Sequence, residues 1–517
     1  MKRLPALALS GVALMTILAG CGGGGGNNGF AVNVPADTGR GSVVTQPPER
    51  VQRLTTDQFT ALLQVTAQGR SLQAIAGTPK CGVDLRYLEY RTIGGQGEAT
   101  NATAAIMVPA GTDPACNGPR PVVLYAHGTA VERSYNIARW TDTSQPAAAE
   151  GVIAAAMFAA QGYIVVAPNY AGYDKSTLTY HPYLNGNQQG KDMVDALTAA
   201  RKTFPFIDAS DAGSLFVTGY SQGGYVALAA HRELQAIGAK VTASAPLSAP
   251  AAISLLTDYT FSGWPALGST LFTPLLSTSW QKQFGNVYTA TGDIYEAQFA
   301  NGIDTLLPSL VPSNTLYTTG KLPPLALFPP NAMPGPVDPS LAVFYAPNNL
   351  VRQSYLTQAA TDIQANPCPG NALPATPASL NNAAPLGCQP LLGFRKAAVA
   401  NDLRNWLPTR PVLMCGGAND PTVNFLSTRA TAGYFRASGM PASALTVVDL
   451  EDVNATDAFS AARAGFAQAK IGTATNAGGT AADQQQAVVQ AYHGTLVPPF
   501  CIAAARGFFA GVLASGG

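Results

Sequence analysis

Strand-like and helix-like segments alternate along the first half of the chain. The apolar run at residues 163–167 has no polar alternation, which is typical of a strand buried on both faces of a sheet. The predicted strands are residues 83–93, 99–109, 121–126, 163–167 and 215–218. Helical stretches at 147–161 and 190–204 precede the last two strands. This order predicts an α/β fold with a mostly parallel sheet flanked by helices.

The region 251–408 breaks this rhythm, because it has many prolines, scattered aromatic residues and no strand periodicity. Strand patterns resume at 411–415 and 444–448. A weakly helical insertion (456–492) then precedes a closing helix near 499–514. The expected division is an α/β core of residues 51–250 and 409–517, with a cap or lid insertion of residues 251–408.

The N-terminus has the pattern of an export signal. A basic start precedes an apolar run that is too short to span a bilayer, and the run ends in Leu18-Ala19-Gly20-Cys21. This ending resembles the lipobox of bacterial lipoproteins, which implies that residues 1–20 are a signal peptide and that Cys21 is lipidated. The alternative is an ordinary signal peptide followed by an unrelated cysteine.

Residues 21–50 are expected to form a flexible tether, because they begin with a run of glycines and continue as a polar linker. The residue after Cys21 is Gly22, whereas the bacterial inner-membrane retention signal places Asp there. The resemblance therefore implies an exported lipoprotein whose anchor holds it in the outer membrane or at the cell surface.

Composition excludes two broad classes of protein. The 517 residues include 30 Lys and Arg against 29 Asp and Glu, so a net charge of +1 provides no basic excess for binding nucleic acid. Charged residues make up 11% and apolar residues 47%, which excludes a mostly disordered chain. No oligomeric state is predicted.

The strongest chemical motif surrounds Ser221, where Gly219-Tyr220-Ser221-Gln222-Gly223 matches the pattern G-x-S-x-G. An apolar strand precedes the serine and an Ala-rich helix follows it, which is the setting of a nucleophile elbow. The flanking glycines fit because a tight turn leaves no room for Cβ atoms beside the serine. Ser221 is the candidate nucleophile, and a solvated serine in a Gly-rich turn is the alternative.

The candidate base is found by elimination among four histidines: His127, His181, His231 and His493. In a fold with a nucleophile elbow, the acid and then the histidine follow the serine in the chain. His231 lies on the helix that begins at Ser221, about 15 Å along it. His493, expected in a loop after the last strand, is therefore the candidate base, and an ordinary surface histidine is the alternative.

The candidate acid is Asp420, which lies in a Gly-rich loop directly after an apolar strand. A carboxylate at this position would orient the imidazole of His493 and stabilise its charged form. The alternative is that Asp420 is a turn aspartate without a catalytic role. In that case the acid would come from three residues that follow the next strand: Asp449, Glu451 and Asp452.

A second strand ends in His127-Gly128-Thr129. A loop of this kind brings a main-chain N–H to the oxyanion, beside the N–H of the residue after the nucleophile. We expect Gln222 and Thr129, or a neighbour of Thr129, to form the oxyanion hole, while His127 shapes the loop.

Export also affects the interpretation of the cysteines, since disulfides persist in oxidising compartments. Six cysteines follow Cys21: Cys81, Cys116, Cys368, Cys388, Cys415 and Cys501. Proximity in the sequence favours the pairs 81–116 and 368–388, which leaves 415–501. That last bridge would tie the loop of Asp420 to the segment of His493. Different pairings, or buried thiols, stay open as well.

Together these motifs resemble the α/β-hydrolase superfamily, and more narrowly the bacterial lipoprotein esterases related to the secretory lipase family. The matching segments are Tyr125-Ala126-His127-Gly128-Thr129, Asn169-Tyr170-Ala171-Gly172-Tyr173, His181-Pro182-Tyr183-Leu184, Gly219-Tyr220-Ser221-Gln222-Gly223-Gly224, and the loops of Asp420 and His493. The resemblance implies a triad of Ser221, Asp420 and His493 under a helical cap, with no metal or organic cofactor. The long stretch between Asp420 and His493 departs from the family pattern and bears on the choice of the acid.

We therefore expect a serine carboxylic-ester hydrolase of the esterase or lipase type. It would form an acyl-enzyme on a hydrophobic acyl or aryl ester, either a small molecule or a polymer. Two alternatives stay open: a serine peptidase on the same fold, and a non-catalytic surface lipoprotein that binds a ligand. A peptidase would need acids in the cap to bind a peptide amino terminus, and the cap is poor in acids.

Overall fold

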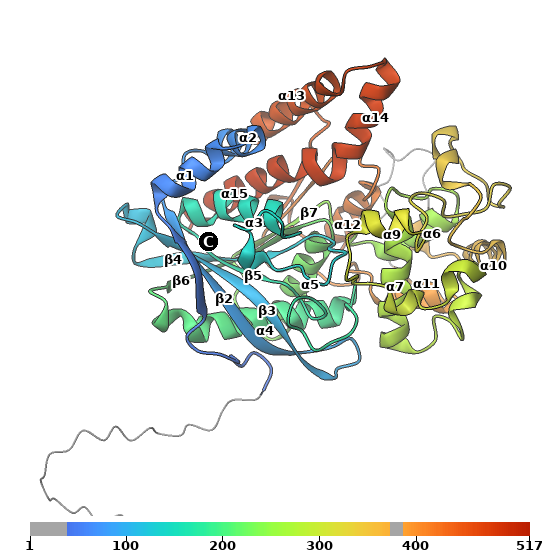
Figure 1. Ribbon diagram of the computed structural model, residues 1–517, viewed down its shortest axis with the longest axis horizontal. Helices are drawn as coiled ribbons and strands as arrows, with labels where there is room; N and C mark the ends of the chain where they lie inside the picture. Colours follow the sequence, from blue (N-terminus) through green and yellow to red (C-terminus); the bar gives the residue numbers. More distant parts are fainter. Residues whose placement is uncertain (1–38, 373–385, 517) are drawn as a thin grey trace, which may run out of the picture. The chain divides into compact units, whose positions relative to one another are not determined.

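The computed structural model describes residues 39–372 and 386–516 (Figure 1). The expected signal peptide, the lipidation site Cys21 and residues 21–38 of the expected tether lie outside the described residues.

The end of the expected tether is not a tether in the structure. Arg40 pairs with Asp195 at 2.9 Å, Ser42 is buried, and Val43 forms a β-bridge with Tyr90. The first strand already begins at Glu49. Residues 39–50 therefore belong to the folded core, a correction that follows from polar side chains finding partners on the core surface.

The core is a nine-stranded sheet with the order β1-β2-β3-β5-β4-β6-β7-β8-β9. The first four strands in this order pair antiparallel, and all pairs from β5 to β9 are parallel. The predicted, mostly parallel α/β sheet is therefore confirmed. The strands are β1 Glu49–Leu54, β2 Gly82–Ile93, β3 Ala99–Ala110, β4 Pro119–Ala126, β5 Ile164–Pro168, β6 Ser210–Tyr220, β7 Ala243–Leu247, β8 Val412–Gly416 and β9 Leu445–Asp449.

Helices cover both faces of the sheet, which explains why the central strands lack polar alternation. On one face, α4 packs against α5, and α5 contacts β4, β6 and β7 (Figure 1). On the other face, α15 contacts β6, β7 and β8 and lies beside α2 and α3. The core helices are α1 Thr56–Gln64, α2 Ala67–Ala76, α3 Ala148–Met157, α4 Gly186–Thr203, α5 Gln222–Ala236, α12 Leu426–Ala437, α13 Ser460–Ala477, α14 Ala481–Ala491 and α15 Val497–Ala514.

The segment between β7 and β8 is helical, and in its described part no strand occurs apart from isolated bridges. It lies beyond one edge of the core in Figure 1. This observation fits the expected insertion at 251–408. Its α-helices are α6 Ile253–Phe261, α7 Ser269–Phe284, α8 Ala297–Ala300, α9 Ser313–Thr318, α10 Gln353–Ala365 and α11 Gly393–Ala400.

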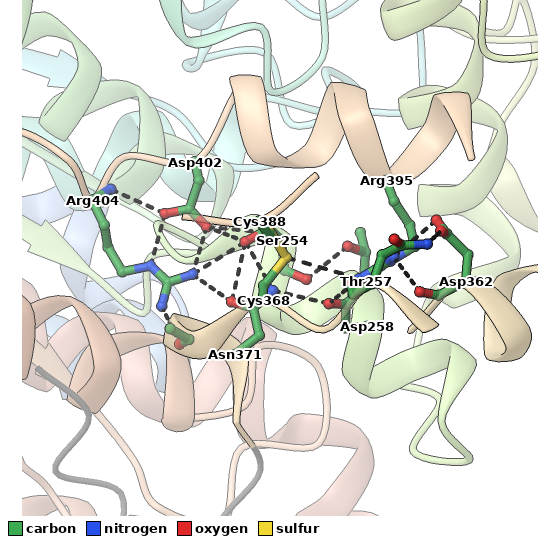
Figure 2. Close-up of a disulfide and its surroundings, with 12 residues drawn as sticks. Ser254, Thr257, Asp258, Asp362, Cys368, Asn371, Cys388, Arg395, Asp402 and Arg404 are labelled. Atoms are coloured by element: carbon green, nitrogen blue, oxygen red, sulfur yellow. Dashed lines mark hydrogen bonds and ion pairs between the residues drawn. A yellow bond between two sulfur atoms is a disulfide. The ribbon is translucent and has the colours of Figure 1, made fainter. Parts of the chain in front are cut away.

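Buried ion pairs hold three helices of this insertion together, as Figure 2 shows. Arg395 on α11 reaches Asp258 on α6 and Asp362 on α10, each at 2.8 Å. Arg404 pairs with Asp402 at 2.8 Å and donates to Ser254 at the start of α6. Both guanidinium groups are almost fully buried. Helix α6 is therefore fixed on one side by charge, which leaves its other side available to line a cavity.

One helix of the described chain, Ala481–Ala514, is long and apolar enough to cross a membrane when judged by length and composition, with a mean hydropathy of 1.7. Half of its most apolar window is buried within the protein. Its C-terminal half, α15, packs on the sheet, which is the arrangement of a core helix.

Candidate active site

Ser221 lies on a sharp turn between β6 and α5. Its backbone is at φ 60° and ψ −123°, a strained conformation that the surrounding packing must maintain. Its N–H donates to the Leu247 carbonyl at 2.9 Å. A Cβ at Gly219 would lie 2.3 Å from the Ala126 oxygen, and one at Gly223 only 2.0 Å from it. The structure therefore has the elbow that the motif predicts, and it requires both glycines.

The three candidate triad residues meet in one hydrogen-bonded chain, although 272 residues separate Ser221 from His493. The Ser221 hydroxyl donates to Nε2 of His493 at 2.8 Å. The Nδ1–H of His493 donates to Oδ2 of Asp420 at 2.7 Å. The other Asp420 oxygen accepts the N–H groups of Thr422 and Val423 at 2.9 and 3.0 Å. The carboxylate is thus fixed on one side by its own loop and on the other by the imidazole.

The position of His493 differs from the prediction of a loop. His493 lies in a π-helical turn, Tyr492–Leu496, within the continuous helix that joins α14 to α15. The Tyr220 hydroxyl donates to the His493 carbonyl at 2.7 Å, so the residue before the nucleophile also holds the base. A helix that widens at one turn can point a side chain inward where an exposed loop was expected.

Two links join the acid loop to the base segment. A disulfide connects Cys415 at the end of β8 to Cys501 on α15, as expected. Tyr492 donates to Glu451 at 2.6 Å, and the Asn419 N–H reaches the Tyr492 hydroxyl at 3.4 Å. The two remaining expected disulfides, Cys81–Cys116 and Cys368–Cys388, are also present. Tyr492 carries no signal in the sequence beyond its place beside His493.

The three further candidate acids do not replace Asp420. Asp449 accepts the N–H groups of Ala418 and Glu451, each at 3.0 Å. Burial raises the pKa of Glu451, but hydrogen bonds from Lys470 and Tyr492 outweigh it and lower that pKa overall. In the described structure none of Asp449, Glu451 and Asp452 hydrogen-bonds to the His493 ring, so Asp420 is the acid that the geometry favours.

The predicted oxyanion donors lie on either side of the nucleophile. Gln222 is the first residue of α5, directly after Ser221. A Cβ at Gly128, the neighbour of Thr129, would lie 3.9 Å from the Ser221 Cβ. Among the hydrogen bonds recorded for residues 39–372 and 386–516, none uses the N–H of Thr129 or Gln222. Both N–H groups therefore fit the role that the sequence predicts for them.

Solved structures of other proteins share this architecture across nearly the whole chain. The rice cell wall degrading esterase LipA from Xanthomonas oryzae covers 92% of this chain and 99% of its own, with a TM-score of 0.66 and 23% identity. A ligand-bound form of LipA gives 0.65. A protein from Legionella pneumophila covers 91% and 98%, with a TM-score of 0.62 and 16% identity. This chain has the α/β-hydrolase fold.

Comparison of the sequence with profiles of protein families gives one match. A profile of the prolyl oligopeptidase family matches residues 153–266, which include the strand, elbow and helix around Ser221. No curated protein matches the chain.

The protein has a cavity of about 730 Å³ that opens onto Ser221 and Asp420. The helical insertion supplies its apolar wall, and α14 and the loop after β8 supply a wall of amide side chains. The apolar wall includes Ile253, Leu256, Phe261, Trp264, Phe272, Leu276 and Phe394. The amide wall includes Asn419, Asn424, Gln485, Gln486 and Gln490. The cavity can therefore hold a molecule with one apolar and one polar part.

The other three histidines are buried and neutral. Burial lowers the pKa of His127 to about 4, of His181 to about 3 and of His231 to about 4. His231 contacts Ser244 on β7 at 2.8 Å and does not line the cavity, in agreement with its exclusion as the base. Nε2 of His181 accepts the side-chain amide of Gln222 at 2.7 Å, which holds the first residue after the nucleophile.

Proposed function

We propose that this α/β-hydrolase is a carboxylic-ester hydrolase in which Ser221 is the nucleophile, His493 the general base and Asp420 the residue that orients the base. The observation that carries the proposal is the hydrogen-bonded chain of 2.8 and 2.7 Å on a strained elbow that opens into a cavity. Each residue lies at the distance that proton transfer requires.

In the proposed mechanism, His493 Nε2 takes the Ser221 proton as the hydroxyl oxygen attacks the ester carbonyl. The negative charge on the carbonyl oxygen is stabilised by the N–H groups of Thr129 and Gln222. Protonated His493 then gives its proton to the departing alcohol, which leaves an acyl-enzyme on Ser221. Water, deprotonated by the same imidazole, hydrolyses this intermediate.

The cavity supports a hydrophobic acyl or aryl ester as substrate. Its apolar wall suits the acyl or aryl group, since burial of each CH₂ group contributes about 0.8 kcal/mol. Its amide wall suits a polar alcohol part. The similarity to a cell wall degrading esterase makes polymer esters part of the proposed range.

The prolyl oligopeptidase match favours a second candidate, a serine peptidase. A peptidase that binds a free amino terminus would be favoured by a pair or cluster of carboxylates in its pocket besides the triad. Apart from Asp420, the only acid that lines this cavity within the described residues is Asp338. The ester hydrolase is therefore the better proposal.

We also propose that the protein is exported, cleaved before Cys21 and anchored through this lipidated cysteine in the outer membrane or at the cell surface. Three disulfides support an oxidising location. Metabolic labelling with a radioactive fatty acid tests this proposal, because labelling should be lost in Cys21→Ala. Labelling that persists in this variant would contradict the anchor.

The function is tested with p-nitrophenyl esters from acetate to palmitate. We expect turnover by the wild type and no turnover by Ser221→Ala. Ser244→Ala, which removes another buried serine hydroxyl away from the cavity, is the matched control and should keep full activity. If folded wild-type protein hydrolyses no ester, the proposal is wrong. Peptide anilides and ligand binding would then distinguish the peptidase from a non-catalytic binding protein.

A further inference from the structure

Glu150 lies behind the loop that carries Thr129, although it is not one of the residues that line the cavity. It belongs to the first turn of α3. Its two carboxylate oxygens accept the Gly128 N–H at 3.0 and 3.2 Å. The hydroxyls of Tyr125 and Tyr135 also donate to it, at 3.0 and 3.3 Å. The carboxylate therefore contacts the main chain directly beside the proposed oxyanion donor.

The neighbouring peptide groups are held as well. The Tyr170 hydroxyl donates to the His127 carbonyl at 2.9 Å, so the peptide between residues 127 and 128 is bound at both ends. His127 Nδ1 lies 2.7 Å from the Gly128 carbonyl, closer than its Nε2 lies to the Asn169 carbonyl at 3.2 Å. Because a neutral imidazole has one N–H, the shorter contact assigns the proton to Nδ1.

These contacts determine the direction of the Thr129 N–H. A trans peptide is planar, and its C=O and N–H point to opposite sides. The Gly128 carbonyl is held by His127, so the N–H of Thr129 must point the other way. The Gly128 N–H is already bonded to Glu150, which leaves Thr129, rather than Gly128, as the donor of this loop.

We propose that Glu150 is a positioning residue for ester hydrolysis: by holding the Gly128 N–H, its carboxylate keeps the Thr129 N–H directed at the carbonyl oxygen of the substrate. The inference rests on the proposed function. Glu150, a carboxylate outside the triad, would thus contribute to stabilisation of the transition state without touching the substrate.

The ionisation of Glu150 gives this role a pH dependence. Burial raises the pKa of Glu150 to about 7, although the bonds from Gly128 and the two tyrosines lower it. The titratable groups that face it are Tyr125, Tyr135 and Tyr170, whose pKa values burial raises well above the ordinary value, and neutral His127. The three tyrosines and His127 stay uncharged near neutral pH, so a change of charge in this pH range comes from Glu150.

Two variants test the proposal. Glu150→Gln removes the charge and keeps one acceptor oxygen, whereas Glu150→Met removes both acceptors. We expect kcat on p-nitrophenyl butyrate to fall about threefold to tenfold in the first and about 100-fold in the second, with KM changed less than twofold. Inhibition by a boronic acid, which forms a tetrahedral adduct on serine, should weaken by the same factors. A purely structural role of Glu150 would not lower kcat and boronic acid affinity by the same factor.

Glu98→Gln is the matched control, since Glu98 also accepts a tyrosine hydroxyl (2.7 Å) and a main-chain N–H (2.8 Å), at the β2–β3 turn. It should behave as the wild type. The ratio of wild-type kcat to that of Glu150→Gln should rise as the pH increases through 7, because protonated Glu150 resembles glutamine.

The possible results separate the inference from the function on which it rests. The inference is wrong if folded Glu150→Gln has the kcat and the boronic acid affinity of the wild type and if the ratio of the two kcat values does not change with pH. This holds even where Ser221→Ala is inactive. This variant alone decides the question if Glu150→Met fails to fold. If the wild type is inactive on esters, or Ser221→Ala remains active, the proposed function itself fails.

Discussion

Removal of the Cys415–Cys501 disulfide should lower both stability and activity, whereas removal of Cys81–Cys116 should lower stability alone. This bridge closes a separation of 86 residues, for which the chain-entropy relation gives about 4.6 kcal/mol of stabilisation. Cys81–Cys116 closes 35 residues and gives about 3.8 kcal/mol by the same relation. All four cysteines are buried, so replacing either pair by alanine perturbs the packing similarly. The two double variants should therefore lose comparable free energies of unfolding, measured by urea denaturation.

Their activities should differ, because only one bridge joins the segments that carry Asp420 and His493. We expect kcat/KM to fall about 10- to 100-fold in Cys415→Ala/Cys501→Ala, since a displacement of about 1 Å in a catalytic group has effects of this size. The Cys81→Ala/Cys116→Ala protein should keep its activity at temperatures where it is folded. Equal activities of the two variants under these conditions would refute the reasoning, because the bridge would then stabilise the fold without aligning the triad.

Three further predictions concern single residues. Asp420→Asn should lower kcat by about 10³- to 10⁴-fold with an unchanged circular dichroism spectrum; a loss of less than tenfold would favour another acid. Gly223→Ala should prevent stable folding, because its Cβ would lie 2.0 Å from the Ala126 oxygen, whereas Gly494→Ala meets nothing within 4 Å and should be tolerated in a thermal unfolding assay. Equal melting temperatures would contradict this. Glu150→Gln should become relatively more stable as the pH rises from 5 to 8. The wild type loses stability as the pH rises from the ordinary pKa of 4.5 to about 7, because the unfolded chain ionises first. The full shift corresponds to about 3 kcal/mol, and we expect about 1–2 kcal/mol because partly exposed Glu150 keeps some of its hydration. Urea unfolding at both pH values measures the difference, and a constant difference would show that the carboxyl does not titrate in this range.

The central strands and the elbow at Ser221 were predictable because their signals are local. Strands buried on both faces consist of apolar runs, and the elbow requires small residues at fixed positions around Ser221. Chain order selected Asp420 and His493 as the candidate acid and base, and proximity in the sequence favoured the three disulfides that the structure contains. In each case a few neighbouring residues, or a short list of candidates, determine the answer.

The strands that were missed have no such signal. β1 (Glu49–Leu54) is an edge strand in which four of six residues are polar and only Leu54 is buried, so it lacks an apolar pattern. β7 (Ala243–Leu247) consists mostly of small residues and contains a proline. Glu150 looks in the sequence like an ordinary acid in the first turn of a helix. Its contact with Gly128 depends on how α3 packs beneath the loop after β4, which no local pattern records.

The π-helical turn at Tyr492–Leu496 sets the rotational phase between two halves of one long helix. An α-helix turns by about 100° per residue, and a π-turn accommodates one additional residue. The downstream half is fixed on the sheet and by Cys501, whereas the upstream half directs Gln486 and Gln490 into the cavity. Removing or adding one residue at this turn would rotate the upstream face of the helix by about 100° relative to the sheet. The length of a single turn thus determines which side chains the substrate meets.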